Sequence, residues 1–566
     1  MTIAGWLQAA LIFALVCALV KPVGAYMARV FEGERVFLTP VVGPLERVVY
    51  RACRVDAQHE MGWKGYAFAL IAFSLVSFVY LYALLRLQAF LPLNPQGFGN
   101  LAPDLAWNTA ISFMTNTNWQ FYSGESTLSS LSQTAGLAWH NFVSAATGIA
   151  IGIALIRALA RRRMSTIGNF WVDLTRANLY VLLPLCIVGA LVLLWQGVPQ
   201  SFDAYPTATT IEGAAQTLPQ GPMASQEIIK ELGTNGGGFV NANSASPWEN
   251  PTGLSNLIEL VCMFLLGAAL TYTFGRYVKD QRQGWVLFAA MTTLFAGGFL
   301  VVYWAEAAGN PAIHALGVMG ANMEGKETRF GIAASALFAT MTTDTSCGAV
   351  NAMHDSFTAL GGLVPMFDMQ LGEVVFGGAG SGFYGIIAFA VLTVFIAGLM
   401  VGRTPEYLGK KIERREVQLA ILAALIVPVF ALVPAAIASV LPAGLATLSN
   451  AGPHGFSEIL YAYTSMANNN GSAFAGLGGN LWWNVSGGVV MLFGRIAIMI
   501  PMLALAGSLV RKQAVATTAG TFRTTSPTFV VLLIGVIVIV GALTFFPADA
   551  LGPVVEHLLN QQGTLY

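Results

Sequence analysis

The segment Gly233–Phe239, with the sequence G-T-N-G-G-G-F, is polar, uncharged and rich in glycine, although it belongs to a very apolar chain. Three related segments accompany it: T-N-T-N-W-Q at 115–120, T-D-T-S-C-G-A at 343–349 and N-N-N-G-S-A-F at 468–474. When Asn118, Gly236, Gly348 and Gly471 are aligned, the intervals are 118, 112 and 123 residues. A single segment of this kind would be an ordinary exterior turn, but four at nearly equal spacing predict a fourfold internal repeat.

The composition around these segments is that of a membrane protein. Of the 566 residues, 55% are hydrophobic and only 10% are charged, and the mean hydropathy is +0.65. Soluble domains carry about 25% charged residues. The 28 basic and 28 acidic residues cancel, so no basic field is available to attract nucleic acid. The five cysteines are scattered over apolar runs, a basic stretch and a polar loop, which favours free thiols over a disulfide framework.

Ten apolar stretches are long enough to cross a bilayer, which takes about 20 residues per helix. Ten crossings put both termini on one side. The first stretch has no basic residue before it and several after it, so we expect a retained span with its N-terminus outside. The predicted spans are residues 3–27, 65–91, 133–156, 177–198, 254–275, 284–305, 375–402, 417–441, 485–510 and 528–547.

The distribution of lysine and arginine supports this topology. Such residues resist translocation and accumulate in cytoplasmic connections. The connections after spans one, three, five, seven and nine hold 23 of the 28 basic residues. The exceptions are Arg86, Lys230, Lys326 and Arg329 in exterior segments and Arg495 inside a span. All four polar segments therefore lie on the outer side.

Short apolar pieces precede the polar segments, for example Leu105–Met114 and Phe330–Met341. They are too short to cross a bilayer but suit re-entrant helices, and non-helical backbone at membrane depth must be buried in protein or line water. We therefore predict an all-α polytopic membrane protein with ten transmembrane helices and a fourfold pseudo-repeat of span, pore helix, filter loop and span. One extra span lies at each end. The first predicted unit, 1–63, holds the first span and a cytoplasmic basic loop, and the last, 524–566, holds the last span and the exterior C-terminus. The four pore repeats between them are 64–165, 166–282, 283–415 and 416–523.

The chemistry of the polar segments suits a weakly hydrated monovalent cation. Backbone carbonyls and the oxygens of asparagine, threonine and serine can replace a hydration shell, and glycine permits the left-handed conformations that turn carbonyls inward. Calcium or magnesium sites rely on carboxylates, and the only acid in the four segments is Asp344. Asp344 could draw cations to the pore entrance or cap a turn. The six histidines show no metal-binding spacing.

The motifs T-N-T-N-W-Q, T-N-G-G-G-F-V-N-A-N-S-A, T-T-D-T-S-C-G-A-V-N and A-N-N-N-G-S-A-F-A-G resemble those of the potassium-binding subunit of the bacterial Kdp-type potassium-transporting ATPase, and the resemblance extends over essentially the whole chain. It implies a channel-like fold with a four-loop selectivity filter for K⁺, Gln120 near that filter, and fewer ion sites than in ordinary potassium channels. The matching filter positions are Asn116, Thr117, Asn118, Thr234, Asn235, Gly236, Ser346, Cys347, Gly348, Asn469, Asn470 and Gly471.

The source of energy for uphill transport is missing from the sequence. There is no G-x-x-x-x-G-K-[ST] loop and no D-K-T-G motif, so we expect no catalytic activity of this chain on its own. The resemblance implies a complex in the bacterial inner membrane in which a P-type ATPase catalytic subunit uses ATP. A single-span accessory subunit and a small hydrophobic peptide would complete it. A stand-alone potassium channel or symporter of the same superfamily is the alternative, and a polytopic lipid-modifying enzyme is disfavoured because the polar segments lack convergent acids and histidines.

Two features inside the spans are candidates for gating or coupling. Arg495 lies deep in an apolar run, where a charge is costly. It could stand below the filter as an electrostatic barrier or as part of the exit path, or it could be a structural partner for an acid or for helix-end carbonyls. The seventh span opens with Glu373 and a glycine-rich segment that includes Gly378, Gly380 and Gly382. We expect either a broken helix beneath the third filter loop or close helix packing. The run of arginines at 161–163 marks the cytoplasmic side and could also contact membrane lipids.

Overall fold

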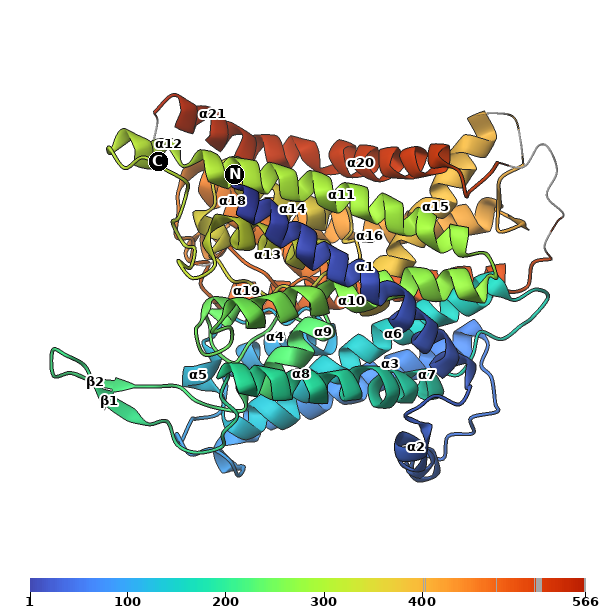
Figure 1. The fold of residues 1–566 in the computed structure, drawn as a ribbon, viewed down its shortest axis with the longest axis horizontal. Coiled ribbons are helices and arrows are strands. Elements are labelled where there is room, and N and C mark those ends of the chain that lie inside the picture. Colours follow the sequence, from blue (N-terminus) through green and yellow to red (C-terminus); the bar gives the residue numbers. More distant parts are fainter. Residues whose placement is uncertain (401, 403, 475, 514, 516–521, 564–566) are drawn as a thin grey trace.

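The computed structural model describes residues 1–400, 402, 404–474, 476–513, 515 and 522–563, so Arg403, counted above among the cytoplasmic residues, lies outside the described part. Helices dominate this structure, and the long ones run roughly along one axis (Figure 1). Ten of them, or of their continuous groups, are long and apolar enough to cross a membrane. The crossing helices are α1 (Ile3–Glu32), α3 (Trp63–Leu87), α6 (Trp139–Ala160), α7 and α8 (Phe170–Arg176, Leu183–Gln196), α10 (Gly253–Tyr277), α11 (Gln281–Ala308), α15 (Ser381–Met400), α16 (Arg414–Ala438), α19 (Leu481–Leu509) and α20 (Pro527–Asp549).

Four shorter helices precede the four polar segments, as expected for re-entrant helices. They are α4 (Pro103–Met114), α9 (Met223–Leu232), α13 (Gly331–Asp344) and α18 (Gly452–Asn468). The remaining helices are α2 (Thr39–Ala52), α5 (Gly124–Thr127), α12 (Pro311–Ala315), α14 (Ala359–Gln370), α17 (Pro442–Leu445) and α21 (Val555–Gln561). Short 3₁₀ or π turns lie at η1 (Gln88–Phe90), η2 (Ser132–Ala138), η3 (Ala177–Leu182), η4 (Asn243–Ala245), η5 (His354–Ser356), η6 (Gly378–Gly380) and η7 (Ala550–Val554).

Burial separates the crossing helices into an inner and an outer set, and the separation follows the repeat. In the most apolar window of the second span of each repeat, α6, α10, α15 and α19, between 61% and 94% of the residues are buried. In the first span of each repeat, and in the additional spans α1 and α20, the corresponding shares are only 22% to 44%. A helix whose apolar side chains face outward suits contact with lipid. The predicted fold class, including the fourfold repeat and the extra spans, is confirmed.

The ends of the crossing helices show why they begin and stop where they do. The side chain of Thr2 caps α1, and Gly33, with φ of 78°, ends it in the left-handed conformation that glycine adopts most readily. Helix α10 begins with a reciprocal capping box between Thr252 and Ser255. The caps at Thr2 and Thr252 satisfy backbone N–H donors that the helix leaves free, and Gly33 donates to carbonyls of the last turn of α1.

The third repeat departs from the predicted span 375–402. The long helix α15 begins only at Ser381, and it is preceded by α14 and by the largely non-helical segment 371–380. Within η6, Ala379 has φ of −45° and ψ of 81°, which is outside helical geometry. The apolar composition of this stretch predicted a span. Its glycines weaken a helix, however, and contacts with other parts of the molecule keep the segment largely non-helical.

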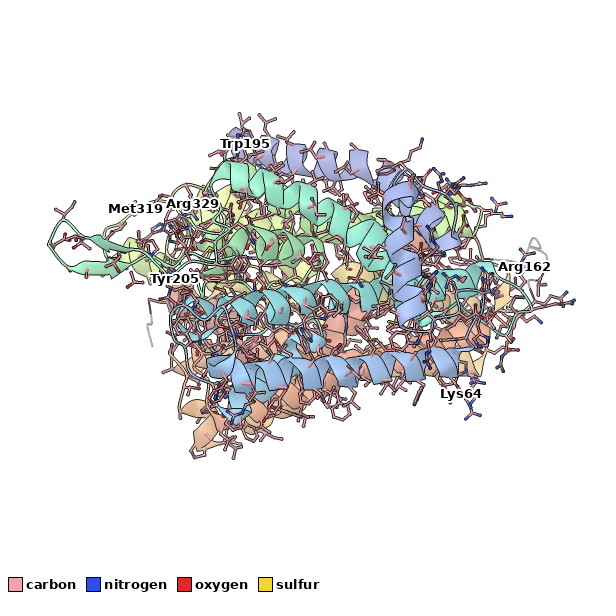
Figure 2. All side chains as sticks on the ribbon, turned by 90° about the horizontal axis from the view of Figure 1, so that it is seen from below. Lys64, Arg162, Trp195, Tyr205, Met319 and Arg329 are labelled. Atoms are coloured by element: carbon pink, nitrogen blue, oxygen red, sulfur yellow. The ribbon has the colours of Figure 1, made fainter. Side chains whose placement is uncertain are left out.

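Two small elements lie outside the bundle at opposite ends. The exterior stretch after α8 forms a hairpin of β1 (Thr207–Thr209) and β2 (Ala215–Thr217), visible at the left of Figure 1. At the other end, β3 (Glu406–Tyr407) pairs with β4 (Lys410–Lys411). The start of α1 and helix α21 lie at the hairpin end in Figure 1, and Figure 2 shows Lys64 and Arg162 at the opposite end. These two basic residues therefore lie at the end away from the hairpin.

Candidate functional site

The four polar segments share one backbone conformation. Each short helix ends at most one residue before a triplet whose first and third residues have positive φ, a region that residues other than glycine seldom adopt. An alternation of this kind turns successive peptide groups in a regular way, as in a carbonyl-lined ion filter. The φ values are 68° and 56° at Asn116 and Asn118, 49° and 85° at Thr234 and Gly236, 58° and 85° at Ser346 and Gly348, and 61° and 99° at Asn469 and Gly471.

The middle residue of each triplet is anchored in the same way in all four loops. Its backbone N–H donates to the carbonyl oxygen five residues earlier, near the end of the preceding helix. The four bonds are Thr117 to Ser112 (2.9 Å), Asn235 to Lys230 (2.8 Å), Cys347 to Thr342 (3.1 Å) and Asn470 to Ser465 (2.9 Å). The carbonyl oxygens of these middle residues accept no hydrogen bond from the residues that the structure describes. Buried carbonyls without partners are uncommon and suit a ligand that supplies positive charge.

The third residue of each loop brings the loops together in a ring. A Cβ atom added at Gly236 would collide with the carbonyl oxygen of Cys347 in the third loop. An added Cβ at Gly348 would likewise collide with the carbonyl oxygen of Asn470 in the fourth loop, and one at Gly471 with that of Thr117 in the first. The first loop has Asn118 at this position, and its Cβ lies 2.8 Å from the site of an added Cβ on Gly237. Glycine is needed here both for its positive φ and for the close approach of the next backbone.

The side chains of the triplets mainly hold neighbouring loops together. Asn116 donates to the carbonyl oxygen of Thr234 (2.8 Å), and Ser346 donates to that of Asn469 (3.0 Å). Asn469 in turn donates to the hydroxyl of Thr117 (2.8 Å), which links the fourth loop to the first. The sequence interpretation counted amide and hydroxyl oxygens among possible ion ligands. In the structure several of these side chains link neighbouring loops, and the backbone carbonyls of the middle residues remain without a hydrogen-bond partner among the described residues.

A cavity of about 320 Å³ opens above the ring on the hairpin side, and the third residues of all four triplets line it. Gln120 lies at this mouth, where its amide exchanges two hydrogen bonds of 3.2 Å with the backbone of Gly238. Asp344 does not line this cavity. It is the last residue of α13, only 1% exposed, and lies behind the third loop.

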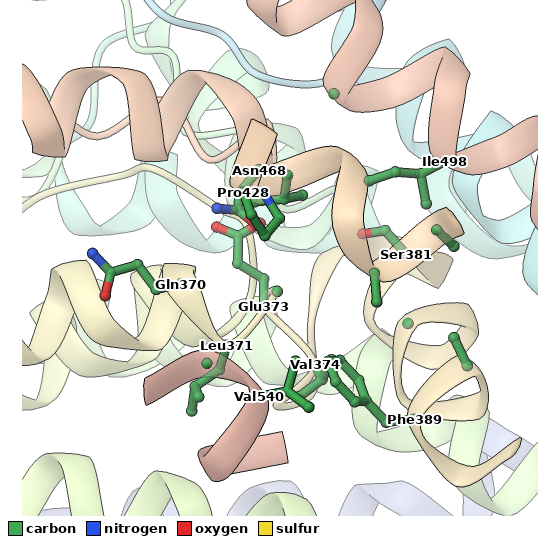
Figure 3. A pocket seen from close by; sticks show the side chains of 18 of the residues that line it. Gln370, Leu371, Glu373, Val374, Ser381, Phe389, Pro428, Asn468, Ile498 and Val540 are labelled. Carbon is green, nitrogen blue, oxygen red and sulfur yellow. The ribbon is translucent and has the colours of Figure 1, made fainter. Parts of the chain in front are cut away.

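A second cavity, of about 80 Å³, lies on the opposite side of the ring. Asn468 and Asn469 at the end of α18 line it together with Glu373, Ser381 and Arg495, and Figure 3 shows several of these side chains around it. Arg495 is 6% exposed and forms no ion pair within 4 Å in the described part of the chain. An unpaired guanidinium at this position places a positive charge beside the inner end of the ring. The cavity continues between α16 and α20, where Pro428 and Val540 line it.

The glycine-rich segment beneath the third loop is both non-helical and tightly packed. The N–H of Gly378 donates to the carbonyl of Thr345 (2.6 Å), and the N–H of Ala379 donates to the hydroxyl of Thr234 (2.8 Å). Gly380 has φ of 105°, and an added Cβ would collide with the carbonyl oxygen of Gly148 on α6. An added Cβ at Gly382 would meet the backbone of Gly377 within the segment itself. The two sequence interpretations, a broken helix and close packing, thus describe one structure.

Sequence reasoning missed the polar groups on α6 that support the ring. Ser144 donates to the side-chain oxygen of Asn116 (2.7 Å), and Asn118 donates to that of Asn141 (2.7 Å). Glu373 accepts from Asn470 (2.7 Å), so it braces the fourth loop as well as lining the inner cavity. The polar residues Asn141 and Ser144 within the apolar run 133–156 could have indicated this support, because polar side chains inside a span need buried partners.

This fold and site define a class of protein: a multi-pass membrane protein in which four pseudo-equivalent re-entrant loops form a carbonyl-lined ring. The solved structure of the potassium transporter TrkH from Vibrio parahaemolyticus has a similar fold, with a TM-score of 0.52 at 17% identity over 88% of this chain and 96% of that one. The family model described as potassium-transporting ATPase A subunit matches residues 10–558, so the chain belongs to this family.

Curated relatives agree over the full length. A protein of Mesorhizobium japonicum named potassium-transporting ATPase potassium-binding subunit is 62% identical over 567 aligned residues, covering 100% of both chains. The protein of the same name from Brucella anthropi is 60% identical, again over 100% of both chains. The family resemblance inferred from the four motifs is thereby confirmed.

Proposed function

We propose that this chain is the potassium-binding and translocating subunit of an ATP-driven potassium import complex. The observation that carries the proposal is the ring of four middle-residue carbonyls, at Thr117, Asn235, Cys347 and Asn470, which the N–H bonds to the pore helices hold in place and which have no hydrogen-bond partner among the described residues. Rings of backbone carbonyls replace the hydration shell of K⁺ in selective filters. The names of the relatives support the same ion.

The path runs from the outer cavity through the ring to the inner cavity. K⁺ enters the space of about 320 Å³, where the third residues of the four triplets converge, and Gln120 keeps the second loop in position. At the ring, carbonyl oxygens replace the water of its hydration shell. On the inner side Arg495 opposes further cations near the ring, and Glu373 with the segment of Gly378, Gly380 and Gly382 governs passage. Asp344 is buried behind the third loop and lines neither cavity of this path.

The work of uphill transport is done by another subunit. In this proposal a P-type ATPase catalytic subunit uses ATP, a single-span accessory subunit and a small hydrophobic peptide complete the complex, and the chain described here is not itself catalytic. The complex lies in the bacterial inner membrane, with the hairpin end of Figure 1 and both termini on the periplasmic side. The basic residues at the other end support this orientation.

The filter is tested by the potassium dependence of ATPase activity in the reconstituted complex. In Gly348→Ala the new methyl group would collide with the carbonyl of Asn470, and the φ of 85° would be strained. We expect the half-saturating K⁺ concentration to rise by about 10-fold or more, equivalent to ~1.4 kcal/mol of binding free energy.

The matched control is Gly297→Ala on the lipid-facing helix α11, where an added Cβ meets nothing within 4 Å. It should leave the half-saturating concentration unchanged. An unaltered K⁺ dependence in both Gly348→Ala and Gly236→Ala would refute the assignment of the ring. Expressed alone, the chain should show no ATPase activity; if it transports K⁺ without any partner, it is a stand-alone channel or symporter.

A further inference from the structure

A separate group of possible cation ligands lies behind the second filter loop. It is formed by α9, α10 and the loop that follows the triplet, and it contains four carboxylates and one ammonium group. All five side chains are at most 1% exposed: Glu227, Lys230, Glu231, Glu249 and Glu259. None of them lines the outer or the inner cavity of the ion path.

The charges of this group do not balance. Lys230 lies 2.7 Å from Glu227 and 3.0 Å from Glu249, and it also donates to the side-chain oxygens of Asn243 and Ser244. One ammonium neutralises one of the four carboxylates, so three negative charges are left over. Uncompensated charges are strongly disfavoured in a buried position. Either protons or a bound cation must therefore compensate them.

The surroundings of Glu259 favour compensation by a bound cation. Both of its carboxylate oxygens are buried and have no hydrogen-bond partner in the described structure. Glu227, Glu231 and Glu259 each offer one oxygen, and these three oxygens lie within 4.8 Å of one another. Calcium binds oxygen at about 2.3–2.6 Å, so ligands on opposite sides of it stand about 5 Å apart. The three oxygens therefore lie close enough together to bind one such ion.

We propose that Glu227, Glu231 and Glu259 bind a divalent cation with the oxygen preference of Ca²⁺, at a site distinct from the filter. Hard oxygen ligands from carboxylates are typical of calcium sites, whereas zinc prefers nitrogen and sulfur. A double charge on the ion leaves only one excess negative charge in the group. A monovalent ion such as the transported K⁺ would leave two.

The site is connected to two filter loops. Glu231 accepts a hydrogen bond from the thiol of Cys347 in the third loop (3.4 Å). Asn243, which accepts from Lys230, donates to the carbonyl oxygen of Gly236 in the second loop (2.7 Å). An ion that orders Glu231 and its neighbours therefore stiffens the contact between these loops, so its role is structural support of the filter.

The test compares metal content in matched variants of the whole purified complex. Wild type, Glu259→Gln and Glu324→Gln, an exposed acid on the outer side, are acid-denatured and measured by inductively coupled plasma mass spectrometry. We expect wild type and Glu324→Gln to contain about one Ca²⁺-like ion more per chain than Glu259→Gln. Divalent ions bound by other subunits contribute equally to all three samples, so they cancel when the metal contents are subtracted.

A second measurement applies even if Glu259→Gln does not fold. The thermal midpoint of the wild-type complex is recorded after unfolding and refolding cycles in Ca²⁺ and in EGTA, and we expect a higher midpoint in Ca²⁺ because a ligand that binds only the folded state stabilises it. Equal metal content in wild type and Glu259→Gln, or a midpoint that does not respond to Ca²⁺, would show that shared protons neutralise the carboxylates and would overturn the proposal.

Discussion

In the filter triplets the backbone and the side chains have different roles. The carbonyls of the middle residues have no hydrogen-bond partner among the described residues, while side chains such as those of Asn116 and Ser346 donate to the carbonyls of the first residues of neighbouring triplets. Gly348 carries no side chain because the backbone of the fourth loop occupies that space. This explains why the motif residues look like ion ligands in the sequence, although most of their side chains stabilise the ring.

Arg495 allows a prediction at the scale of one residue. Its guanidinium lines the cavity just inside the ring. A positive charge about 8–16 Å from a K⁺ raises the energy of that ion by about 1–2 kcal/mol at an effective dielectric constant near 20. In Arg495→Gln we expect the half-saturating K⁺ concentration of ATPase activity to fall by about 10-fold and the maximal rate to fall with it. Arg495→Lys keeps the charge and should retain the wild-type affinity. Unchanged kinetics in the glutamine variant would remove Arg495 from the ion path.

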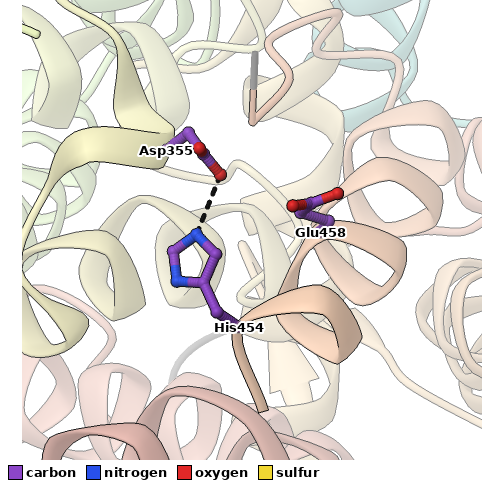
Figure 4. Close-up of side chains that lie close together, drawn as sticks. All are labelled: Asp355, His454 and Glu458. Atoms are coloured by element: carbon purple, nitrogen blue, oxygen red, sulfur yellow. Dashed lines mark hydrogen bonds and ion pairs between the residues drawn. The ribbon is translucent and has the colours of Figure 1, made fainter. Parts of the chain in front are cut away.

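Helix α18 shows how an element is held where the filter needs it. Near its N-terminal end, His454 donates to Asp355 in η5 and to Glu556 on α21, both at 2.9 Å, and Glu458 lies close by (Figure 4). Its ring also stacks on Phe474, which follows the fourth triplet. The fourth pore helix is thereby tied to the third repeat and to the C-terminal helix.

The contacts of His454 with Asp355 and Glu556 predict that the complex loses stability at alkaline pH. Burial alone would lower the pKa of His454, but its hydrogen bonds with Asp355 and Glu556 raise that pKa to about 10. A raised pKa means that the stabilisation is complete below the unfolded value, about 6.5, and is lost as the pH rises through 10. We expect the thermal midpoint of the complex to fall between pH 7 and pH 10.5, and to fall less in His454→Gln.

The control for this measurement is His59→Gln, an exposed histidine at the opposite end of the molecule, which should follow the wild-type curve. Parallel curves for wild type and His454→Gln would contradict this prediction.

The whole molecule combines ten crossings with a sharp difference between its two ends. One end carries the hairpin and the start of α1, and Lys64 and Arg162 lie at the opposite end (Figures 1 and 2). Only helices whose backbone is internally satisfied can face lipid. The four re-entrant loops are tolerated because the inner helices, above all α6, surround them.

The orientation can be checked with a native cysteine. Cys53, at the end of α2, is exposed at the basic end, whereas Cys186 and Cys347 are buried. A membrane-impermeant maleimide should modify Cys53 in inverted vesicles and leave it unmodified in intact cells or right-side-out vesicles. Cys53→Ser should abolish the signal. Modification from the outside would reverse the proposed topology.

The ten spans, the fourfold repeat and the family could be predicted from the sequence, because burial in a bilayer demands long apolar runs and a pore demands irregular polar turns at fixed intervals. The sequence could not decide that the seventh long helix starts at Ser381, since apolar composition is the same in a helix and in a packed loop. Nor could it place Asp344 behind the third loop or bring Glu231 and Glu259 together. Those outcomes depend on contacts between residues far apart in the chain, and only the packing of the helices settles which buried polar groups find partners.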